Sequence, residues 1–264
     1  MTDAISYYDD HPISEAHVWA AVRARTGGFD ARLRAEDLFD FDQDHYGGLS
    51  AVDALATRAA LGPGMRVLDL CAGLAGPARF IASRRGCRVV ALELHAGRAA
   101  GAARLTRAVG LERLVRIVRG DARRLPFRRA RFDACISEEA LLHIEDKAAV
   151  LADVRRVLVP GGRLAFTDWI AHPRLADRER ARLRDWMAAT TVQTLDGYRT
   201  LLGRAGFGAI EAEDLSDEWR RVVRDRIQRL AARRDEVAQR ALHAFFLGLI
   251  EQGKLGGGRF TAVS

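Results

Sequence analysis

The sequence VLDLCAGLAGPAR, residues 67–79, joins an apolar run to a helix-forming stretch through a turn that contains glycine. Residues 65–70 are typical of a buried strand, and Pro77 suits the first turn of a helix. Gly73 and Gly76 let the backbone approach a ligand, while the start of the helix presents N–H groups that lack intrahelical partners. A dinucleotide site would hold three glycines as G-x-G-x-x-G. The loop by itself is therefore a weak indication of a nucleotide.

Outward from this loop, short apolar runs alternate with helical stretches. Such alternation predicts βαβ units and a parallel sheet. The expected strands are 65–70, 88–93, 114–118, 132–137, 163–169, 209–214 and 259–263. The expected helices are 77–85, 96–109, 147–158, 174–190, a helix that Asp196 caps and that runs to Arg204, and a stretch over 217–251 that Ser216 caps. An interruption near 233–236 leaves open whether that last stretch is one helix or two.

Carboxylates stand at the carboxyl ends of the first three expected strands. Glu93 lies 20 residues after Gly73, where an acid can accept hydrogen bonds from both hydroxyls of a ribose. Asp121 is placed to meet an adenine amino group. Each acid alone has an ordinary explanation, with Asp69 as a turn residue, Glu93 as a surface residue and Asp121 as a helix cap. Together, at one edge of a parallel sheet, they favour a nucleoside crevice.

Residues 62–170 resemble the class I S-adenosylmethionine-dependent methyltransferases. VLDLCAGLAGPARFIA is similar to the glycine-rich motif of that family, VVALEL to its acidic ribose motif, and GDARRLPF to its adenine motif. FDACISEEALLHI is similar to the fourth-strand motif, and LVPGGRLAFTDW to the turn before the fifth strand. GPAR at 76–79 and the C-terminal GGGRFTAVS resemble the small-molecule branch, which includes sarcosine/dimethylglycine, phosphoethanolamine, tocopherol and sterol methyltransferases.

This resemblance implies an α/β fold with a Rossmann-like, seven-stranded, mostly parallel sheet, an antiparallel last strand, and helical lid and cap elements. It also implies a helical lid segment at 1–60 and a methyltransferase domain at 61–264, with helical insertions at about 171–205 and 215–255. The expected cofactor is S-adenosyl-L-methionine. The residues expected to line its site are Asp69, Cys71, Ala72, Gly73, Gly76, Glu93, Leu94, Asp121, Ala122 and Ser137.

Four side chains are candidates for catalysis on the acceptor side of the site. By the resemblance, Glu138 and His143 follow the fourth strand at the mouth of the crevice, and His45 and Tyr46 lie in the lid. A base is needed only if the nucleophile arrives protonated, and His143 can orient a substrate or take its proton. The alternatives are helix packing for His143 and lid packing for His45 and Tyr46. Asp168, which ends the fifth strand, either faces the site or caps the next turn.

The charge of the chain is unevenly distributed. Arginine supplies 40 of the 42 basic residues, and the formal net charge is +7. This balance raises nucleic acid as a partner, but the arginines alternate with acids on the expected helices, as on solvated faces. Residues 1–60 are acidic, with eleven acidic and five basic groups. An acidic lid suits a cationic or amine acceptor, so a small-molecule acceptor is favoured and nucleic acid is disfavoured.

Cys71 and Ala75 depart from the family pattern, which has glycine at the first position and often at the second. Both are small, so we expect a narrower loop that still binds the cofactor. Cys71, Cys87 and Cys135 form no C-x-x-C pair, so we expect structural cysteines, no disulfide framework and no metal site. The N-terminus is polar and no run approaches the length of a membrane span, so we expect a cytoplasmic protein. A homodimer is left open.

The resemblance implies methyl transfer from S-adenosylmethionine to a small-molecule acceptor. Its amine-methylating members favour nitrogen, with oxygen and carbon as the other acceptor atoms. One alternative is an RNA or DNA methyltransferase. Against it, the chain has no Asn/Asp-Pro-Pro-Tyr/Phe motif for a flipped base and no basic arm. The other alternative is a protein that binds the cofactor without catalysis, for which Cys71 and Ala75 are the only hints.

Overall fold

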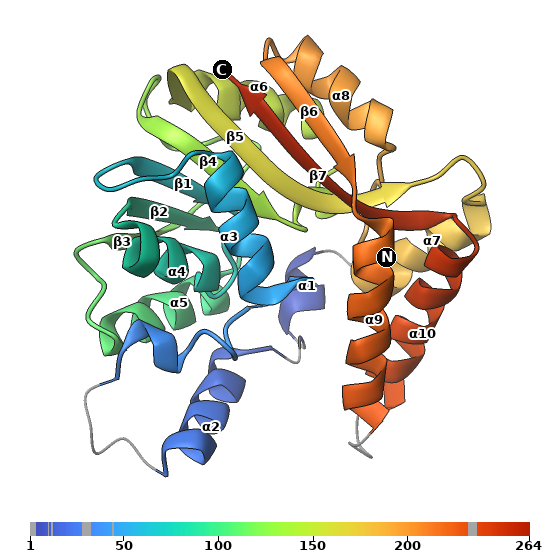
Figure 1. Ribbon diagram of the computed structural model, residues 1–264, viewed down its shortest axis with the longest axis horizontal. Coiled ribbons are helices and arrows are strands. Elements are labelled where there is room, and N and C mark those ends of the chain that lie inside the picture. Colours follow the sequence, from blue (N-terminus) through green and yellow to red (C-terminus); the bar gives the residue numbers. More distant parts are fainter. Residues whose placement is uncertain (1–3, 10, 12, 28–32, 44, 232–236) are drawn as a thin grey trace.

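The fold is an open α/β sheet. The structure is a computed structural model that describes residues 4–9, 11, 13–27, 33–43, 45–231 and 237–264. Among these residues the strands form one sheet in the order β3-β2-β1-β4-β5-β7-β6 (Figure 1). β7 is antiparallel to β5 and β6, and the other neighbouring strands are parallel, which confirms the predicted fold. The strands are β1 Arg66–Leu70, β2 Arg88–Glu93, β3 Val115–Arg119, β4 Phe132–Glu138, β5 Leu158–Ala171, β6 Gly208–Asp214 and β7 Leu255–Val263.

Helices cover both faces of the sheet because the strand side chains alternate between two apolar cores. Ala134 and Ile136 of β4 pack with α3, α4 and α5, while Cys135 between them packs with α6 and α8. A third core around Trp169 and Trp219 lies beside the sheet, where α7, α9 and α10 form the cap (Figure 1). The helices are α1 Ala4–Asp9, α2 Glu15–Thr26, α3 Gly48–Arg58, α4 Gly76–Arg85, α5 Ala96–Ala108, α6 Lys147–Val157, α7 Asp177–Met187, α8 Leu195–Arg204, α9 Ser216–Ala231 and α10 Val237–Glu251, with short 3-10 turns η1 Ala35–Asp37 and η2 Leu141–His143.

Two strands begin four or five residues earlier than the sequence predicts. β5 begins at Leu158 because Leu158 pairs with Phe132 across an irregularity in the register, so the Pro-Gly-Gly turn lies within the strand. β7 begins at Leu255, so its three glycines are strand residues. They are small because the cap packs on them: a Cβ at Gly257 would lie 2.2 Å from the ring of Trp219.

Two predicted helix caps are wrong, because Asp196 and Ser216 lie within the helices that they were expected to cap. α8 begins at Leu195, and the side chain of Thr194 accepts a hydrogen bond from the amide of Gly197 at 2.9 Å. Asp196 lies instead in the first turn, where its charge favours the positive end of the helix. The stretch over 217–251 comprises α9 and α10, and Ser216 is the first residue of α9. The interruption predicted near 233–236 lies outside the described residues.

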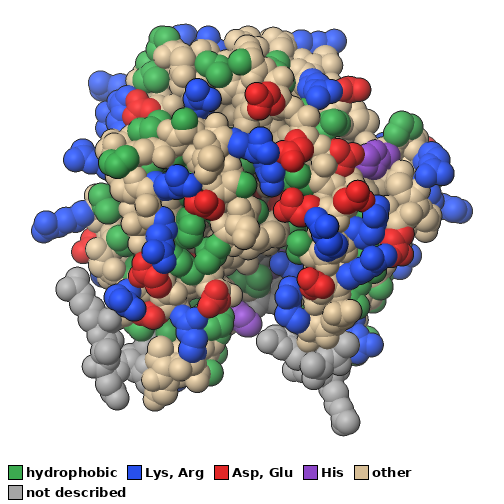
Figure 2. All heavy atoms as spheres, in the orientation of Figure 1, with side chains coloured by type: hydrophobic (Ala, Val, Ile, Leu, Met, Phe, Trp, Pro, Cys, Tyr) green, Lys and Arg blue, Asp and Glu red, His purple; other side chains and the backbone are tan. Residues whose placement is uncertain are grey.

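Arginine and acidic side chains are mixed on the surface of the molecule. Figure 2 shows basic and acidic side chains interspersed over one face of the molecule. Arg199 pairs with Asp196, and Arg220 with Asp217, one helical turn apart in each case. In the described part of the chain, no helix is both long and apolar enough to cross a membrane.

A buried ion pair fixes the N-terminal lid to the sheet domain. Neither Asp42 nor Arg79 exposes any of its side chain, and Arg79 Nη2 lies 2.8 Å from Asp42 Oδ2. The guanidinium also donates to Thr106 Oγ1 at 3.1 Å and to the carbonyl of Ala102 at 3.4 Å. Because these partners satisfy a charge that burial would otherwise penalise, the pair holds the segment before α3 against α4 and α5.

Replacing one member of this pair is expected to leave an uncompensated charge. Arg79→Met should lower the free energy of unfolding by about 3–5 kcal/mol, the usual cost of breaking a buried pair. Urea titration measures the change. The double variant Asp42→Asn, Arg79→Met removes both charges and should recover part of the loss. A cost below about 1 kcal/mol for Arg79→Met would place the pair among weak surface interactions.

Candidate functional site

A cleft of about 1290 Å³ lies at the carboxyl ends of the parallel strands, between the lid and the cap. Parallel strands bring their carboxyl ends to the same edge of a sheet, and ligands of open α/β sheets bind there. Most of the predicted site residues line this cleft, namely Asp69, Cys71, Ala72, Gly73, Glu93, Leu94, Asp121, Ala122, Glu138, His143, His45 and Tyr46.

Gly76 and Ser137 do not line the cleft. A Cβ at Gly76 would lie 2.2 Å from the carbonyl oxygen of Asp42, so this glycine admits the lid backbone. The hydroxyl of Ser137 is buried and donates to the carbonyl of Leu70 at 2.9 Å. Both residues shape the loop after β1 rather than present a group to the cleft.

Glu93 joins the loops that follow β1 and β2. One carboxylate oxygen accepts the amide of Gly73 at 2.8 Å, and the other accepts the amide of His95 at 2.7 Å. Burial raises the pKa of Glu93, while these amides and the charge of Arg98 oppose the rise. Each carboxylate oxygen has a second lone pair, so the group can still accept hydrogen bonds from a ribose.

Asp69 presents a buried carboxylate that lacks a full set of partners. It is 3% exposed, and its Oδ2 has no hydrogen-bond donor among the described residues. Burial raises the pKa of Asp69 to about 7, the charge of Glu93 adds to the rise, and the amide of Ala78 opposes it. A buried carboxylate is costly unless a cation or donor meets it. The position therefore fits a positively charged ligand in the cleft.

Asp121 is already paired. The guanidinium of Arg123 donates to both of its carboxylate oxygens, with Nε 3.1 and 3.0 Å away. The amide of Arg123 donates to Asp121 Oδ1 at 2.9 Å. The hydrogen bond from Arg123 is the main cause of the lowered pKa of Asp121. An adenine amino group at this carboxylate would share it with Arg123.

The loop after β1 keeps a glycine-type backbone without glycine at two positions. Cys71 and Ala75 both have φ of +59°, a left-handed conformation that costs an L-residue about 1–2 kcal/mol. Burial raises the pKa of the Cys71 thiol, so the thiol stays protonated and unreactive near neutral pH. Cys87 and Cys135 are buried, and neither they nor Cys71 form a disulfide.

A chain of polar contacts leads from Asp42 in the lid to Glu138 at the end of β4. Gln43 donates from Nε2 to Asp42 Oδ1 at 2.6 Å. Because that amide end is the donor, Gln43 Oε1 is the acceptor that faces His45 Nε2 at 2.9 Å. The same nitrogen lies 3.1 Å from Glu138 Oε2, and both side chains are buried. The lid thereby connects Arg79 to Glu138, and Gln43 is a site residue that the sequence does not reveal.

His143 is held between α1 and the loop after α7. Its Nδ1 lies 3.1 Å from the carbonyl of Ala188, so the proton sits on Nδ1, because a carbonyl only accepts. Its Nε2 is then the acceptor for the hydroxyl of Tyr8, 3.1 Å away. Nothing in the local sequence pairs Tyr8 with a residue 135 positions away. The lid therefore contributes a tyrosine that the sequence does not single out.

Tyr46 belongs to an aromatic wall. Its ring stacks on Trp219 at 5.2 Å and meets Trp169 edge-on at 5.2 Å, and the guanidinium of Arg226 lies 4.5 Å above it. Its amide donates to Glu139 Oε1 at 2.6 Å. Burial raises the pKa of Tyr46, so its hydroxyl stays neutral.

Asp168 faces away from the cleft. It follows Thr167 directly, so its side chain emerges on the opposite face of the sheet. There it accepts a hydrogen bond from the hydroxyl of Tyr198 on α8. Burial raises the pKa of Asp168 to about 6, and the charge of Lys147 opposes the rise. The side chain thus braces α8 and does not line the cleft.

The family model for the methyltransferase domain matches residues 68–166. The sarcosine/dimethylglycine N-methyltransferase of Halorhodospira halochloris is 30% identical over 193 residues, which cover 73% of this chain and 69% of that protein. This chain is a member of the S-adenosylmethionine-dependent methyltransferase family. The glycine/sarcosine/dimethylglycine N-methyltransferase of Actinopolyspora halophila is 33% identical over 203 residues, or 76% of this chain. The alignment spans 34% of that relative's length.

The methyltransferase fold extends to the cap. The solved phosphoethanolamine N-methyltransferase 2 of Haemonchus contortus, in complex with S-adenosyl-L-methionine, matches this chain with a TM-score of 0.76. The match covers 100% of this chain and 60% of that one at 21% identity. The methyl donor of the family is S-adenosylmethionine, which carries a sulfonium and an ammonium. The orphan oxygen of Asp69 and the acceptor groups of Glu93 fit such a ligand.

Removing the carboxylate of Glu93 is expected to weaken cofactor binding. Glu93→Ala should cost roughly 1.5–3 kcal/mol of binding free energy, the scale of lost charged hydrogen bonds. Part of this cost comes from the amides of Gly73 and His95, which lose their acceptor. Isothermal titration calorimetry with S-adenosylmethionine measures it. Unchanged affinity would mean that Glu93 does not face the ribose.

The titration of Asp69 is expected to make cofactor binding depend on pH. A cation favours the ionised carboxylate, so the proton must leave before binding below about pH 7. Affinity for S-adenosylmethionine should therefore rise from pH 6 to pH 8, by at most about tenfold per pH unit. S-Adenosylhomocysteine, which lacks the sulfonium charge, should show a smaller rise. Calorimetry on Asp69→Asn tests the assignment, because a pH dependence unchanged in this variant would contradict it.

Proposed function

We propose that this methyltransferase transfers the methyl group of S-adenosylmethionine to the nitrogen of a small-molecule amine, and that Glu138 receives that amine. The observation that carries the proposal is the buried carboxylate of Glu138 on the acceptor side of the cleft. Its side chain is 5% exposed, and neither oxygen has a well-aligned hydrogen-bond donor among the described residues. A buried carboxylate in this state attracts an N–H group or a cation.

The walls around Glu138 support the same acceptor. Trp169, Phe246 and His243 line the cleft with aromatic rings, and aromatic faces attract cations such as ammonium groups. Burial lowers the pKa of His243 to about 4, so its ring stays neutral. The Nδ1 of His243 lies 2.7 Å from the carbonyl of Gln239, which leaves its Nε2 as an acceptor. These groups suit an amine better than an anion.

The chemistry assigns Glu138 a defined task. S-Adenosylmethionine supplies an electrophilic methyl group on a positively charged sulfur. The amine attacks with its lone pair, the N–C bond forms as the S–C bond breaks, and the nitrogen becomes positively charged. Glu138 orients an N–H of the neutral amine and can accept the proton that the methylated nitrogen releases. His45 faces Glu138 from the lid, with Nε2 3.1 Å from Oε2.

The lid also separates the reacting groups from water. Tyr8 of α1 contacts His143 on the acceptor side, and Asp9 of the same helix lies 2.8 Å from His95 on the cofactor side. One short helix thus spans both halves of the cleft. Exclusion of water protects a reactive sulfonium from hydrolysis and strengthens the electrostatic interactions inside. The relatives named above as N-methyltransferases act on amines, which agrees with this acceptor.

The role of Glu138 is expected to appear in turnover rather than in cofactor binding. Glu138→Gln should lower methyl transfer to the accepted amine by roughly a hundredfold, within the range for a positioned base, and leave the affinity for S-adenosylmethionine within a few fold. The measurement is release of S-adenosylhomocysteine across a panel of primary, secondary and tertiary amines. Glu211→Gln, a surface carboxylate on β6, is the matched control. Turnover of the corresponding alcohols but of no amine would contradict the proposal.

A further inference from the structure

A row of polar side chains crosses the sheet from Glu138 to its outer edge. The strand register places Glu138 of β4 beside Thr167 of β5, Thr167 beside Arg259 of β7, and Arg259 beside Glu213 of β6. Residues in lateral register point to the same face of a sheet, so these four side chains share one face. Glu138, Thr167 and Arg259 are buried, although that face is otherwise largely apolar. A polar row in such a position calls for an explanation beyond packing.

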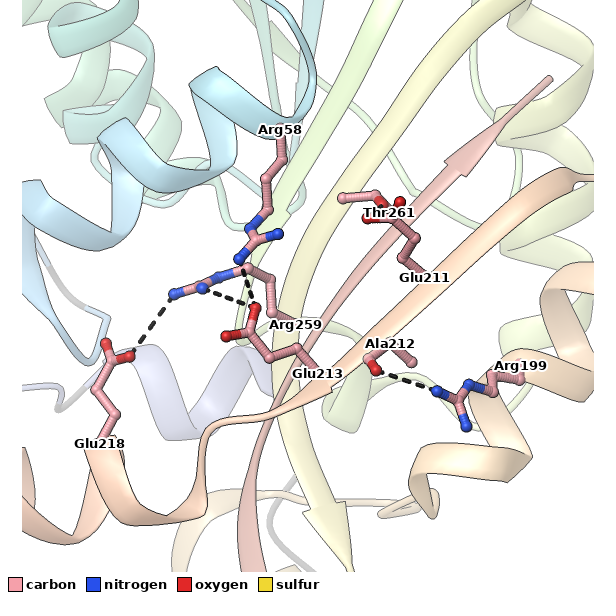
Figure 3. Close-up of polar contacts among 8 residues, drawn as sticks. All are labelled: Arg58, Arg199, Glu211, Ala212, Glu213, Glu218, Arg259 and Thr261. Atoms are coloured by element: carbon pink, nitrogen blue, oxygen red, sulfur yellow. Dashed lines mark hydrogen bonds and ion pairs between the residues drawn. The ribbon is translucent and has the colours of Figure 1, made fainter.

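The charges in this row alternate. Arg259 Nη1 lies 3.1 Å from Glu213 Oε2, and Arg58 of α3 contacts the same oxygen at 2.6 Å (Figure 3). Arg259 Nη2 lies 3.8 Å from Glu218 in the first turn of α9. The charged row therefore runs from a buried carboxylate at the cleft, through a buried guanidinium, to an ion pair that solvent reaches.

Arg259 is the cation of the sheet that acts on Glu138. Burial raises the pKa of Glu138 well above its ordinary value, the carboxylates of Asp69 and Glu139 add to the rise, and the charge of Arg259 opposes it. His45 faces Glu138 from the lid at 3.1 Å. Arg259 Nε is buried with no hydrogen-bond partner among the described residues, so one N–H of the guanidinium lacks an acceptor.

Arg259 also fixes the cap beside the site. Glu218 belongs to α9, and a Cβ at Gly47 of the lid would lie 3.6 Å from Glu218 Oε1. About two turns further along α9, Arg226 lies over the ring of Tyr46 and donates to the carbonyl of His45 at 3.4 Å. The contact between Arg259 and Glu218 thus holds the first turn of α9 at the sheet. Further along, the same helix contacts His45, which faces Glu138.

We propose that Arg259 is a positioning residue of the acceptor site, which sets the pH at which Glu138 becomes charged, and that Glu213 moderates this effect by pairing with Arg259. The inference deepens the proposed function, because an ionised Glu138 is what an amine acceptor would meet. Arg259 reaches neither the amine nor the methyl donor in this role. Its positive charge acts on Glu138 across the sheet, and its contact with Glu218 holds α9.

An electrostatic role of Arg259 predicts a change in the titration of Glu138 that a purely structural role of Arg259 does not. Removing Arg259 removes the positive charge that stabilises the carboxylate, so Glu138 should ionise at higher pH. Removing the charge of Glu213 frees Arg259 from its nearest anion, so Glu138 should ionise at lower pH. Two substitutions at partners of a single ion pair should therefore shift one titration in opposite directions. Loss of packing alone would shift neither in this way.

The test is a ¹³C NMR titration of the Glu138 side-chain carboxyl in the full chain, identified as the signal absent from Glu138→Gln. We expect Arg259→Met to raise the midpoint by about one pH unit and Glu213→Gln to lower it by a smaller amount, the scale of a nearby charge. Arg259→Lys keeps the charge and should restore most of the midpoint. If Arg259→Met does not fold, Arg259→Lys and Glu213→Gln still provide the comparison.

Figure 3 also contains the matched controls. Glu211 lies two residues before Glu213 on β6 and faces Thr261 instead of an arginine, so Glu211→Gln should leave the midpoint unchanged. Arg199 donates to the carbonyl of Ala212 from α8, so Arg199→Met should also leave it unchanged. Shifts of the same sign in Arg259→Met and Glu213→Gln, or no shift in either, would overturn the proposal.

This experiment is independent of the acceptor. The titration needs no substrate, so opposite shifts without turnover of any amine would support the row and contradict the proposed function. Turnover of an amine that depends on Glu138, without opposite shifts, would do the reverse. Where an amine is turned over, the acidic limb of its pH–rate profile should move with the NMR midpoint in each variant.

Discussion

The ion pair between Asp42 and Arg79 is the constraint on which the arrangement of the site depends. Two fully buried charges are tolerated because each meets its opposite and further hydrogen-bond partners. Asp42 then orders the lid residues that follow it, since Gln43 donates to its second oxygen and presents its own oxygen to His45. Arg79 on α4 thus fixes, through Asp42 and Gln43, the position of the lid residue His45 that faces Glu138.

The cleft collects negative charge in a chain whose total charge is positive. Asp69, Glu93 and Glu138 stand at the ends of β1, β2 and β4, and burial raises the pKa of each. Burial makes the ionised form of each carboxylate costly, and a bound cation would offset that cost. A sulfonium and an amine are both such ligands. The arginines lie mainly on outer faces among acids, and this explains how a net charge of +7 coexists with an acidic cleft.

The alternation of side chains along β5 separates two functions within consecutive residues. Thr167 lies in the polar row beside Glu138, and Trp169 lines the cleft on the same face. Asp168, between them, bonds to Tyr198 behind the sheet. Of these three residues, Trp169 therefore lines the cleft, Thr167 belongs to the buried polar row, and Asp168 holds α8.

The strands, the mostly parallel sheet and the acids at its carboxyl edge could be predicted from the sequence. Those features depend on local patterns: apolar runs, a glycine turn before a helix, and acids at the ends of consecutive strands, which topology brings to one edge. The acceptor half could be predicted only in part, through Glu138, His45, Tyr46 and His143. Three contacts could not be predicted and are seen only in the folded structure. They join Asp42 to Arg79, Tyr8 to His143, and Arg259 to Glu213. These residues lie 37, 135 and 46 positions apart, and linear spacing carries no information about contacts that the packing of lid, sheet and cap creates.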